Sequence, residues 1–402
     1  MSSSDPADSA WPAVAYETLR WDSDDSVPIS RTTARRHRGP YEAAVVQPIA
    51  GLKVPLPADL HALADDATNE VARFDAELGS EIAPFKAVLL RSESTSSSQI
   101  ENLTASARAI AEAELHPFGS NNASLIVANT SAMTAAVELA DRIDADSILR
   151  MHKALLSPSR PDTAGRWRQQ PVWIGGTRYG PHEAGFVPPK WELVPDAIND
   201  LVAFIDRDDV PVLAHAAVAH AQFETIHPFS DGNGRTGRAL LQAQLRNKGL
   251  TRNVTVPVSA GLLTDTGAYF GALDEFRRGH TLPIIDQVVR AAFVAIENGR
   301  QLVADLHDIR ARWAEEIGAR RGSTTWRIAD LLLRHPVVNA PFLAEELGIR
   351  VPNVYRALGP LIDAGVVVQA TNKKRDRVWR APDVLRALDQ FAARAGRRTR
   401  PH

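Results

Sequence analysis

The chain of 402 residues has no cysteine, which excludes disulfide bonds and metal sites built from thiolates. It also has no apolar run that approaches the length of a membrane span. The first residues, Met-Ser-Ser-Ser-Asp-Pro-Ala-Asp, contain neither the basic nor the apolar region of a secretory leader. We therefore expect a cytoplasmic protein that does not bind membranes.

The net charge is only −2, but the charged residues are divided unevenly. From Arg320 to His402 there are 16 Lys and Arg against 7 Asp and Glu, a net of +9, which leaves −11 for the other 319 residues. The length predicts two or three domains. An acidic body joined to a basic module is therefore expected.

The most informative stretch is residues 227–238, which read His-Pro-Phe-Ser-Asp-Gly-Asn-Gly-Arg-Thr-Gly-Arg. It supplies a base, an acidic group, glycines with accessible backbone N–H groups, and two arginines. The alternative is an Asx-rich turn between two helices, with the arginines on a solvated face. That alternative explains the glycines, but not a His, an Asp and two Arg at these spacings.

The run from Arg235 to Lys248 has no proline and carries apolar residues at helical spacing. Gly249 follows where the glycine at a helix C-terminus would stand. The loop is therefore expected to lead into a helix N-terminus, where free N–H groups and the helix dipole attract anions. A polyphosphate fits such a site. The stretch is not a P-loop, because it follows no strand and lacks Gly-Lys-Ser/Thr.

At every fixed position this stretch resembles the signature of Fic-domain (Fic/DOC) proteins, His-Pro-Phe-x-Asp/Glu-Gly-Asn-Gly-Arg-x-x-Arg. The resemblance implies a mainly α fold, with a Fic helical core and a β-hairpin flap. It also implies an enzyme, a protein adenylyltransferase. Such an enzyme transfers AMP from ATP to a Ser, Thr or Tyr hydroxyl of a protein, including itself, and releases pyrophosphate.

The resemblance also implies roles for individual residues. His227 is the expected general base, and Asp231 the ligand of Mg²⁺, the one cofactor implied. Phe229 is expected to anchor the loop in the core. The other expected nucleotide-binding residues are Gly232, Asn233, Gly234, Arg235, Arg238, Gly175, Tyr269 and Phe270, of which Asn233, Arg235 and Arg238 are also expected to be catalytic.

His215 and His220 lie upstream of His227, but the gaps between the three match no zinc-binding pattern. We expect the first two histidines to be packed or capping residues.

A second motif, Ser97-x-x-x-Glu101-Asn102, lies N-terminal to this core. Apolar residues at helical spacing predict a helix that begins in the preceding serine cluster: Ile100, Leu103, Ala107 and Ile110. The motif resembles the inhibitory helix Ser/Thr-x-x-x-Glu-Gly/Asn of Fic proteins. The resemblance implies that Glu101 pairs with Arg238 and so holds ATP in an unproductive pose. The alternative is a surface glutamate in an ordinary helix-face pair.

A third segment, residues 165–189, has short β-type pieces on either side of Gly-rich turn residues, which predicts a hairpin. It resembles the flap that overhangs the Fic active site. In that resemblance the flap holds the target protein by strand addition, through main-chain hydrogen bonds.

The basic C-terminal segment predicts three helices, at Trp326–Arg334, Pro341–Leu347 and Pro352–Ala364. A hairpin with a basic tip at residues 372–377 follows. This order resembles a winged-helix domain, with Asn353, Tyr355 and Arg356 on the recognition helix. Winged helices bind DNA or dock proteins, and the net charge favours DNA.

The predicted organisation has four parts. Residues 1–40 form a poorly ordered arm, 41–120 a helical region with the inhibitory helix, 121–318 the Fic catalytic core, and 319–402 the winged-helix domain and basic tail. Two functional alternatives stay open: a Fic enzyme that transfers another group or removes AMP, and a DNA-binding regulator with a nucleotide-sensing Fic domain. A homodimer stays open as well.

Overall fold

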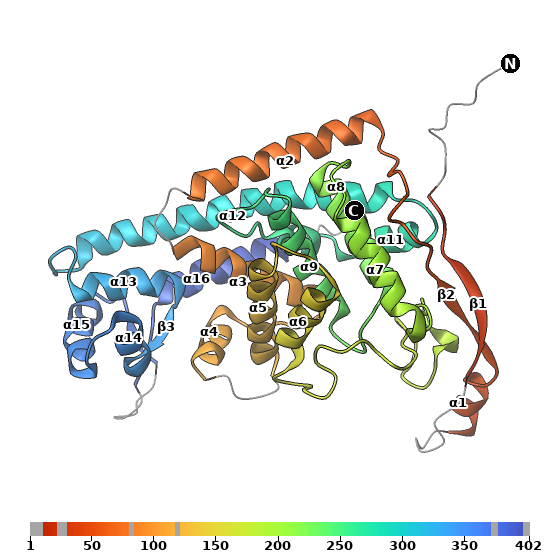
Figure 1. Cartoon of the computed structure of the whole chain (residues 1–402). Helices are drawn as coiled ribbons and strands as arrows, with labels where there is room; N and C mark the ends of the chain where they lie inside the picture. Colours follow the sequence, from red (N-terminus) through yellow and green to blue (C-terminus); the bar gives the residue numbers. More distant parts are fainter. Residues whose placement is uncertain (1–10, 22–29, 80–83, 117–120, 371–376, 397–402) are drawn as a thin grey trace, which may run out of the picture. The chain divides into compact units, whose positions relative to one another are not determined.

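A computed structural model describes residues 11–21, 30–79, 84–116, 121–370 and 377–396 (Figure 1). The chain divides into two compact units. The first comprises Met1–Thr68, Ala135–Lys248 and Gly267–Val289, and the second Asn69–Thr134, Gly249–Thr266 and Arg290–His402. The predicted fold class is confirmed, because the described residues are mainly helical with small sheets.

The elements of the first unit are β1 (Ala15–Arg20), α1 (Arg31–Arg36), β2 (Pro40–Val45), α6 (Ala145–Leu156), η1 (Pro181–Glu183), η2 (Trp191–Leu193), α7 (Val194–Ile205), α8 (Val212–Ile226), α9 (Asn233–Asn247) and α11 (Thr266–Arg277). Three longer helices contribute several residues to each unit: α2 (Ala58–Gly79), α5 (Asn122–Glu138) and α12 (Leu282–Glu316).

The elements of the second unit are α3 (Pro84–Ile100), α4 (Ala107–Leu115), α10 (Val258–Leu263), α13 (Thr324–Arg334), β3 (Val337–Asn339), α14 (Ala340–Leu347), α15 (Val351–Asp363), β4 (Val368–Gln369), β5 (Val378–Arg380) and α16 (Pro382–Ala395). The strands form an antiparallel sheet in the order β3-β5-β4.

Helices α8 and α9 form the centre of the first unit. Every residue of α8 after Val212 is buried, and five of its residues are alanines, whose small side chains allow close packing. On α9, a Cβ at Gly237 would lie 2.6 Å from Oε1 of Glu224 and 2.9 Å from Cδ1 of Phe223, both on α8. Glycine at this position therefore lets the two helices approach, and their packing fixes the loop that joins them.

The N-terminal segment differs from the prediction of a poorly ordered arm. Strand β1 pairs antiparallel with β2, from Ala15 opposite Val45 to Arg20 opposite Pro40. The hydroxyl of Ser30 caps α1. Leu19 and Trp21 pack against a small apolar cluster with Tyr41, Ala43 and Val187 at its centre. The prediction is thus wrong for residues 11–21 and 30–40, because burial of these apolar side chains orders the segment. Residues 1–10 and 22–29 lie outside the described part.

The prediction that a helix begins in the serine cluster is also wrong. Helix α3 begins at Pro84 and ends at Ile100, and a separate helix, α4, begins after Ser106, which caps it. The serines lie inside α3 because they have partners there. The hydroxyl of Ser94 donates to the carbonyl of Ile126 on α5, and that of Ser98 donates to the carbonyl of Ser94.

The basic C-terminal segment contains the three predicted helices, with starts that lie within two residues of the expected ones. It does not form a unit of its own, as the predicted boundary at residue 319 required. Val337, Val378 and Leu385 share an apolar cluster with Ala111 of α4. This shared burial places the segment in one unit with α3 and α4. Its assignment as a winged helix stays a prediction, and the tip at 371–376 lies outside the described residues.

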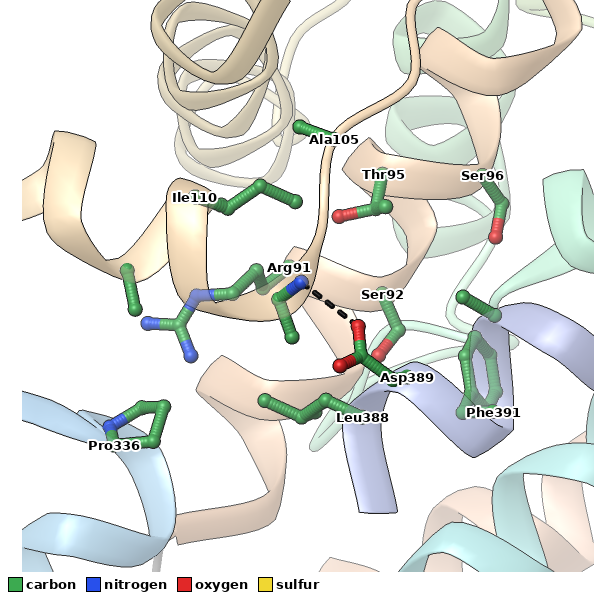
Figure 2. Close-up of a pocket in the computed structure, with 13 residues that line it drawn as sticks. Arg91, Ser92, Thr95, Ser96, Ala105, Ile110, Pro336, Leu388, Asp389 and Phe391 are labelled. Atoms are coloured by element: carbon green, nitrogen blue, oxygen red, sulfur yellow. Dashed lines mark hydrogen bonds between the residues drawn. The ribbon is translucent and has the colours of Figure 1, made fainter. Parts of the chain in front are cut away.

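Figure 2 shows the junction of α3, α4 and α16 within this unit. The backbone N–H of Ala107 donates to Oδ1 of Asp389 at 2.9 Å. On α3, Arg91 forms a bidentate pair with Glu114 of α4 and donates to the carbonyl of Arg334 at 2.6 Å. The cavity between these helices holds about 30 Å³, which is room for one or two water molecules. The junction is therefore a packed interface rather than a ligand site.

None of the described helices is both long and apolar enough to cross a membrane.

Candidate functional site

His227 stands directly at the end of α8. Its backbone is left-handed, with φ 50° and ψ 61°, and its N–H donates to the carbonyl of Phe223 at 2.9 Å, which closes the helix. Nδ1 of His227 lies 3.9 Å from Oε2 of Glu224, whose side chain is buried. The imidazole itself is 19% exposed. The expected base is thus held at a fixed helix end with part of its ring accessible.

The loop after His227 leads into the N-terminus of α9, as predicted. Gly232 precedes the helix with φ 78°, and a Cβ there would lie 2.9 Å from Cδ2 of Leu155. Glycine is therefore required both by conformation and by space. Helix α9 starts at Asn233, and Gly249, with φ 71°, follows its end.

The buried side chain of Asn233 fastens the loop. Its Oδ1 accepts from the N–H of Phe229 at 2.8 Å, and its Nδ2 donates to the carbonyl of Phe229 at 2.9 Å. These bonds use the amide oxygen and one amide hydrogen. A role for Asn233 in binding anionic charge stays a prediction. In such a role, its second amide hydrogen would donate to the anion.

Phe229 anchors the loop in the core, as expected, and is fully buried. Its ring stacks on His152 of α6, with centroids 3.6 Å apart, and on Trp167 at 5.0 Å. Nδ1 of His152 accepts from the N–H of Gly165 at 3.0 Å, so its proton lies on Nε2, which donates to the carbonyl of Asp231 at 3.1 Å. Burial lowers the pKa of His152 to about 4. A neutral histidine on α6 therefore orients the loop through the carbonyl of Asp231.

Asp231 presents a partly exposed carboxylate next to the first turn of α9. It lies 3.3 Å from Nε of Arg160 and 3.7 Å from an Nη of Arg235. Among the described residues no group of three or more His, Asp or Glu could hold a metal. A single carboxylate oxygen nonetheless fits Mg²⁺, which keeps several waters and takes its other ligands from phosphates.

The two arginines of the stretch are buried, Arg235 at 6% and Arg238 at 1% exposure. This excludes the alternative in which they lie on a solvated face. Buried guanidinium groups need anionic or polar partners. Their burial in the first turns of α9 concentrates positive charge where the helix dipole is also positive.

The remaining predicted nucleotide-site residues differ in how far they are buried. Tyr269 is buried at 1%, and its hydroxyl lies 2.7 Å from Nε2 of His220, so its ring faces protein. The neighbouring Phe270 is 46% exposed. Gly175 lies in the hairpin with φ 77°. Nucleotide contacts of Tyr269, Phe270 and Gly175 stay predictions.

His215 and His220 are hydrogen-bonded inside the core. Nε2 of His215 donates to the carbonyl of Phe204 at 2.8 Å, and its Nδ1 accepts from the amide of Gln244 at 3.0 Å. His220 lies against the hydroxyl of Tyr269. These partners agree with packed histidines rather than with metal ligands.

The predicted hairpin at residues 165–189 is present as a single antiparallel bridge between Ile174 and Phe186. The N–H of Ile174 donates to the carbonyl of Phe186 at 2.8 Å. Strand β2 lies beside the hairpin, because the N–H of Ala44 donates to the carbonyl of Val187 at 2.9 Å. The hairpin is thus supported from one side by the N-terminal strands.

The motif at residues 97–102 forms the C-terminus of α3 in the second unit. Asn102 has φ 60°, and the N–H of Leu103 and of Asn102 donate to the carbonyls of Ser98 and Gln99. These two bonds make a Schellman motif with Asn102 as its left-handed residue. The Gly or Asn in the inhibitory pattern is therefore a conformational requirement. Ser97 is fully buried, and Glu101 is exposed.

Two residues near the loop were missed by the sequence interpretation as site residues. His152 lies among the buried residues of α6, and a histidine among apolar residues at helical spacing is a signal that could have found it. Arg168 was read only as part of the hairpin, although its side chain bonds to the carbonyl of His227. A single arginine in a loop carries no pattern that reveals such a partner.

Comparison with known proteins supports the resemblance. Residues 142–245 match the Fic/DOC family. Protein adenylyltransferase fic-1 of Caenorhabditis elegans is 29% identical over 160 residues, which are 39% of this chain and 28% of that protein. A probable protein adenylyltransferase of Aquifex aeolicus is 43% identical over 68 residues, 17% of this chain and 21% of that one. The chain thus spans about a quarter of the length of these relatives.

Solved structures of Fic proteins are also similar to this chain. A Fic family protein from Desulfovibrio desulfuricans aligns over 84% of this chain and 98% of its own, with 19% identity and a TM-score of 0.49. Fic-1 of C. elegans aligns over 60% of this chain and 73% of its own, with 21% identity and a TM-score of 0.43. The family match covers α6, α7, α8 and most of α9, and it includes the whole stretch from His227 to Arg238. The similarity to Fic/DOC proteins is thus located in residues 142–245 of this chain.

Proposed function

We propose that this protein is an adenylyltransferase, which transfers AMP from ATP to a Ser, Thr or Tyr hydroxyl of a protein. The main support is one juxtaposition: His227 ends α8, and the next helix begins six residues later with two buried arginines in its first turns. A base beside an anion site suits attack on a phosphate. Relatives that match part of this chain are named protein adenylyltransferases.

In the proposed reaction the hydroxyl oxygen of the target bonds to the α-phosphorus of ATP. The bond from that phosphorus to the oxygen bridging the β-phosphate breaks, and pyrophosphate leaves with the electron pair. His227 accepts the hydroxyl proton, a role that suits an imidazole because it is the side chain most often used as a general base.

The first turn of α9 would hold the phosphates. Backbone N–H groups from Gly232 to Gly234 point from a helix N-terminus, and the guanidinium groups of Arg235 and Arg238 supply charge. Because the arginines are buried, their interaction with phosphate is screened less by water than that of surface arginines. Asp231 would hold Mg²⁺, which when bound neutralises charge on the phosphates.

Transfer of label from ATP tests this function. With ATP labelled at the α-phosphate, the purified chain is expected to label itself or a protein of a lysate, and His227→Ala is expected to remove the signal. His280→Ala is the matched control, because His280 is an exposed histidine of the same unit, paired with Glu275. Label that moves from the γ-phosphate instead would establish phosphate transfer. Release of AMP from a labelled protein would establish removal.

We further propose that Glu101 inhibits this transfer. Glu101 is the last residue before the left-handed Asn102, so its position is set by a well-formed helix end. The proposed effect is engagement of Arg238, which removes a phosphate ligand. A nucleotide panel given to the Glu101→Gly variant with a lysate tests both the inhibition and the choice of nucleotide.

DNA binding by the C-terminal segment is a separate proposal. Asn353, Tyr355 and Arg356 on α15 are exposed, as a recognition helix requires, and the net charge from Arg320 onward is +9. The same surface of α15 also carries exposed Val351 and Ile362. Binding through phosphates predicts that affinity falls steeply with salt. A gel-shift series with no binding at low salt would assign the segment to protein docking instead.

A cytoplasmic location and a homodimer stay predictions. Cell fractionation and light scattering test them.

A further inference from the structure

The side chain of Arg168 is buried in the first unit, at 3% exposure, and all of its hydrogen-bond acceptors among the described residues are main-chain carbonyls. Burial lowers its pKa to about 10, so the guanidinium stays charged at neutral pH. A buried cation without a carboxylate partner is costly unless polar groups replace water. The surrounding carbonyls therefore stabilise the buried charge of Arg168, and Arg168 in turn provides the hydrogen-bond donor that these carbonyls need.

Two of these carbonyls belong to the helix end that carries the base. Nε of Arg168 donates to the carbonyl of His227 at 2.9 Å, and an Nη donates to that of Ile226 at 3.4 Å. The backbone N–H of Arg168 donates to the carbonyl of Pro228 at 3.0 Å. The last carbonyls of a helix have no partner within it, and a cation there is favoured by the dipole. One residue thus holds three consecutive carbonyls around His227.

The same guanidinium holds both ends of the hairpin. One Nη donates to the carbonyl of Gln170, where the hairpin begins, at 3.3 Å, and the other donates to that of Pro189, where it ends, at 2.5 Å. The bridge between Ile174 and Phe186 lies between these two ends. The planar fork of arginine can serve acceptors in several directions at once, which a lysine ammonium on a flexible stem cannot.

We propose that Arg168 is a positioning residue for the transfer reaction, an inference that rests on the proposed function. It fixes the hairpin, which would hold the target, relative to the backbone of the base His227. The target hydroxyl and the base then meet at reacting distance. Misplacement of reacting groups by about 1 Å costs on the order of 10² in rate. The phosphates of the nucleotide would be held by the first turn of α9, so ATP affinity should depend on Arg168 much less than kcat does.

The test measures steady-state kinetics of AMP transfer to a protein target, in the Glu101→Gly background, for Arg168→Ala and Arg168→Lys. The matched control is Arg207→Ala. Arg207 also donates to two main-chain carbonyls, those of Ala50 and Leu52, which belong neither to the hairpin nor to the helix end at His227. ATP affinity and the far-UV circular dichroism spectrum are measured for each variant.

For Arg168→Ala we expect kcat to fall by about 10²-fold, with ATP affinity within about twofold of the parent. Millimolar guanidinium chloride, against the same concentration of sodium chloride, should restore part of kcat. Arg168→Lys should be intermediate, and it replaces the alanine variant if that one does not fold. Arg207→Ala should keep kcat and gain nothing from guanidinium.

The inference is overturned if the kcat of a folded Arg168 variant stays within about twofold of the parent. It is also overturned if ATP affinity falls in step with activity, or if Arg168→Ala and Arg207→Ala behave alike. Failure of the proposed function looks different, because the Glu101→Gly parent itself would then transfer no AMP.

Discussion

Asn102 and His227 are the two residues other than glycine with positive φ in the described part of the chain, and each ends a helix in a different unit. Asn102 closes α3 with two backbone hydrogen bonds from its own segment. His227 closes α8 with one, and the carbonyls around it are satisfied by the side chain of Arg168 from another segment. The first helix end is thus locally determined, and the second is held by tertiary structure.

This difference matters because the left-handed region costs most side chains roughly 1–2 kcal/mol, whereas asparagine tolerates it. A histidine in that region stays there only if its surroundings hold it. Such backbone strain is common at functional sites. The local helix end can therefore be altered by changes within the motif, and the tertiary one by changes at a distance in sequence.

The largest expected effect comes from the strained position itself. His227→Ala should reduce AMP transfer by ~10²–10⁴-fold, because a positioned base contributes about this much, while ATP binding is largely kept. Label incorporation and ATP affinity are measured together in the Glu101→Gly background. Transfer that persists in the alanine variant would show that His227 is a structural residue.

The next effect is a gain. Glu101→Gly should raise AMP transfer about tenfold or more, because a hydrogen bond to a charged group is worth roughly 1.5–3 kcal/mol and loss of the proposed Glu101–Arg238 pair shifts the competent population. Glu101→Gln should do so in part. Arg238→Ala should not mimic the gain, since it also removes a phosphate ligand. Equal rates for wild type and Glu101→Gly at saturating ATP would make Glu101 an ordinary helix residue.

The two helix ends also show what the sequence could and could not predict. The stretch at 227–238 predicted the α9 N-terminus and the buried anchor Phe229, because its chemistry is dense and local. It could not predict Arg168, whose partners are distant in sequence. The prediction that a helix begins in the serine cluster failed for the same reason. The hydroxyl of Ser94 bonds to the carbonyl of Ile126 on α5, a partner that no local pattern reveals.

The C-terminal boundary was likewise decided by tertiary contacts. Val337 and Leu385 share a cluster with Ala111, and Arg91 bonds to the carbonyl of Arg334. The charge composition predicted a separate domain, but the segment shares buried apolar contacts and a hydrogen bond with α3 and α4. Removing residues after Gly322 would expose this cluster, so experiments on the segment should use the full chain.

A smaller effect is expected at Asn102 and distinguishes conformation from contact. Asn102→Gly should keep both stability and inhibition, because glycine adopts the left-handed region freely. Asn102→Val should cost roughly 1–2 kcal/mol and raise AMP transfer in proportion to the disturbed helix end. Thermal unfolding and label incorporation are compared for the pair. If both variants raise transfer equally, the asparagine side chain makes a contact of its own.

The smallest effect concerns pH and compares two histidines, one in each unit, whose pKa is lowered in the folded chain. Burial lowers the pKa of His152 to about 4, and burial together with Arg91 and Arg334 lowers that of His335 to about 4. Unfolding restores an ordinary value near 6.5, so the unfolded chain takes up protons between these two values. The stability that these histidines contribute is therefore complete above pH 6.5 and is lost progressively as the pH falls toward 4.

We expect urea unfolding at pH 7, 6 and 5 to show this loss of stability. His152→Gln and His335→Gln should each make the free energy of unfolding depend less steeply on pH. His152 also orients the loop through Asp231, so only its variant should lower AMP transfer at pH 7. A slope that neither variant changes would assign the pH dependence to carboxylates instead.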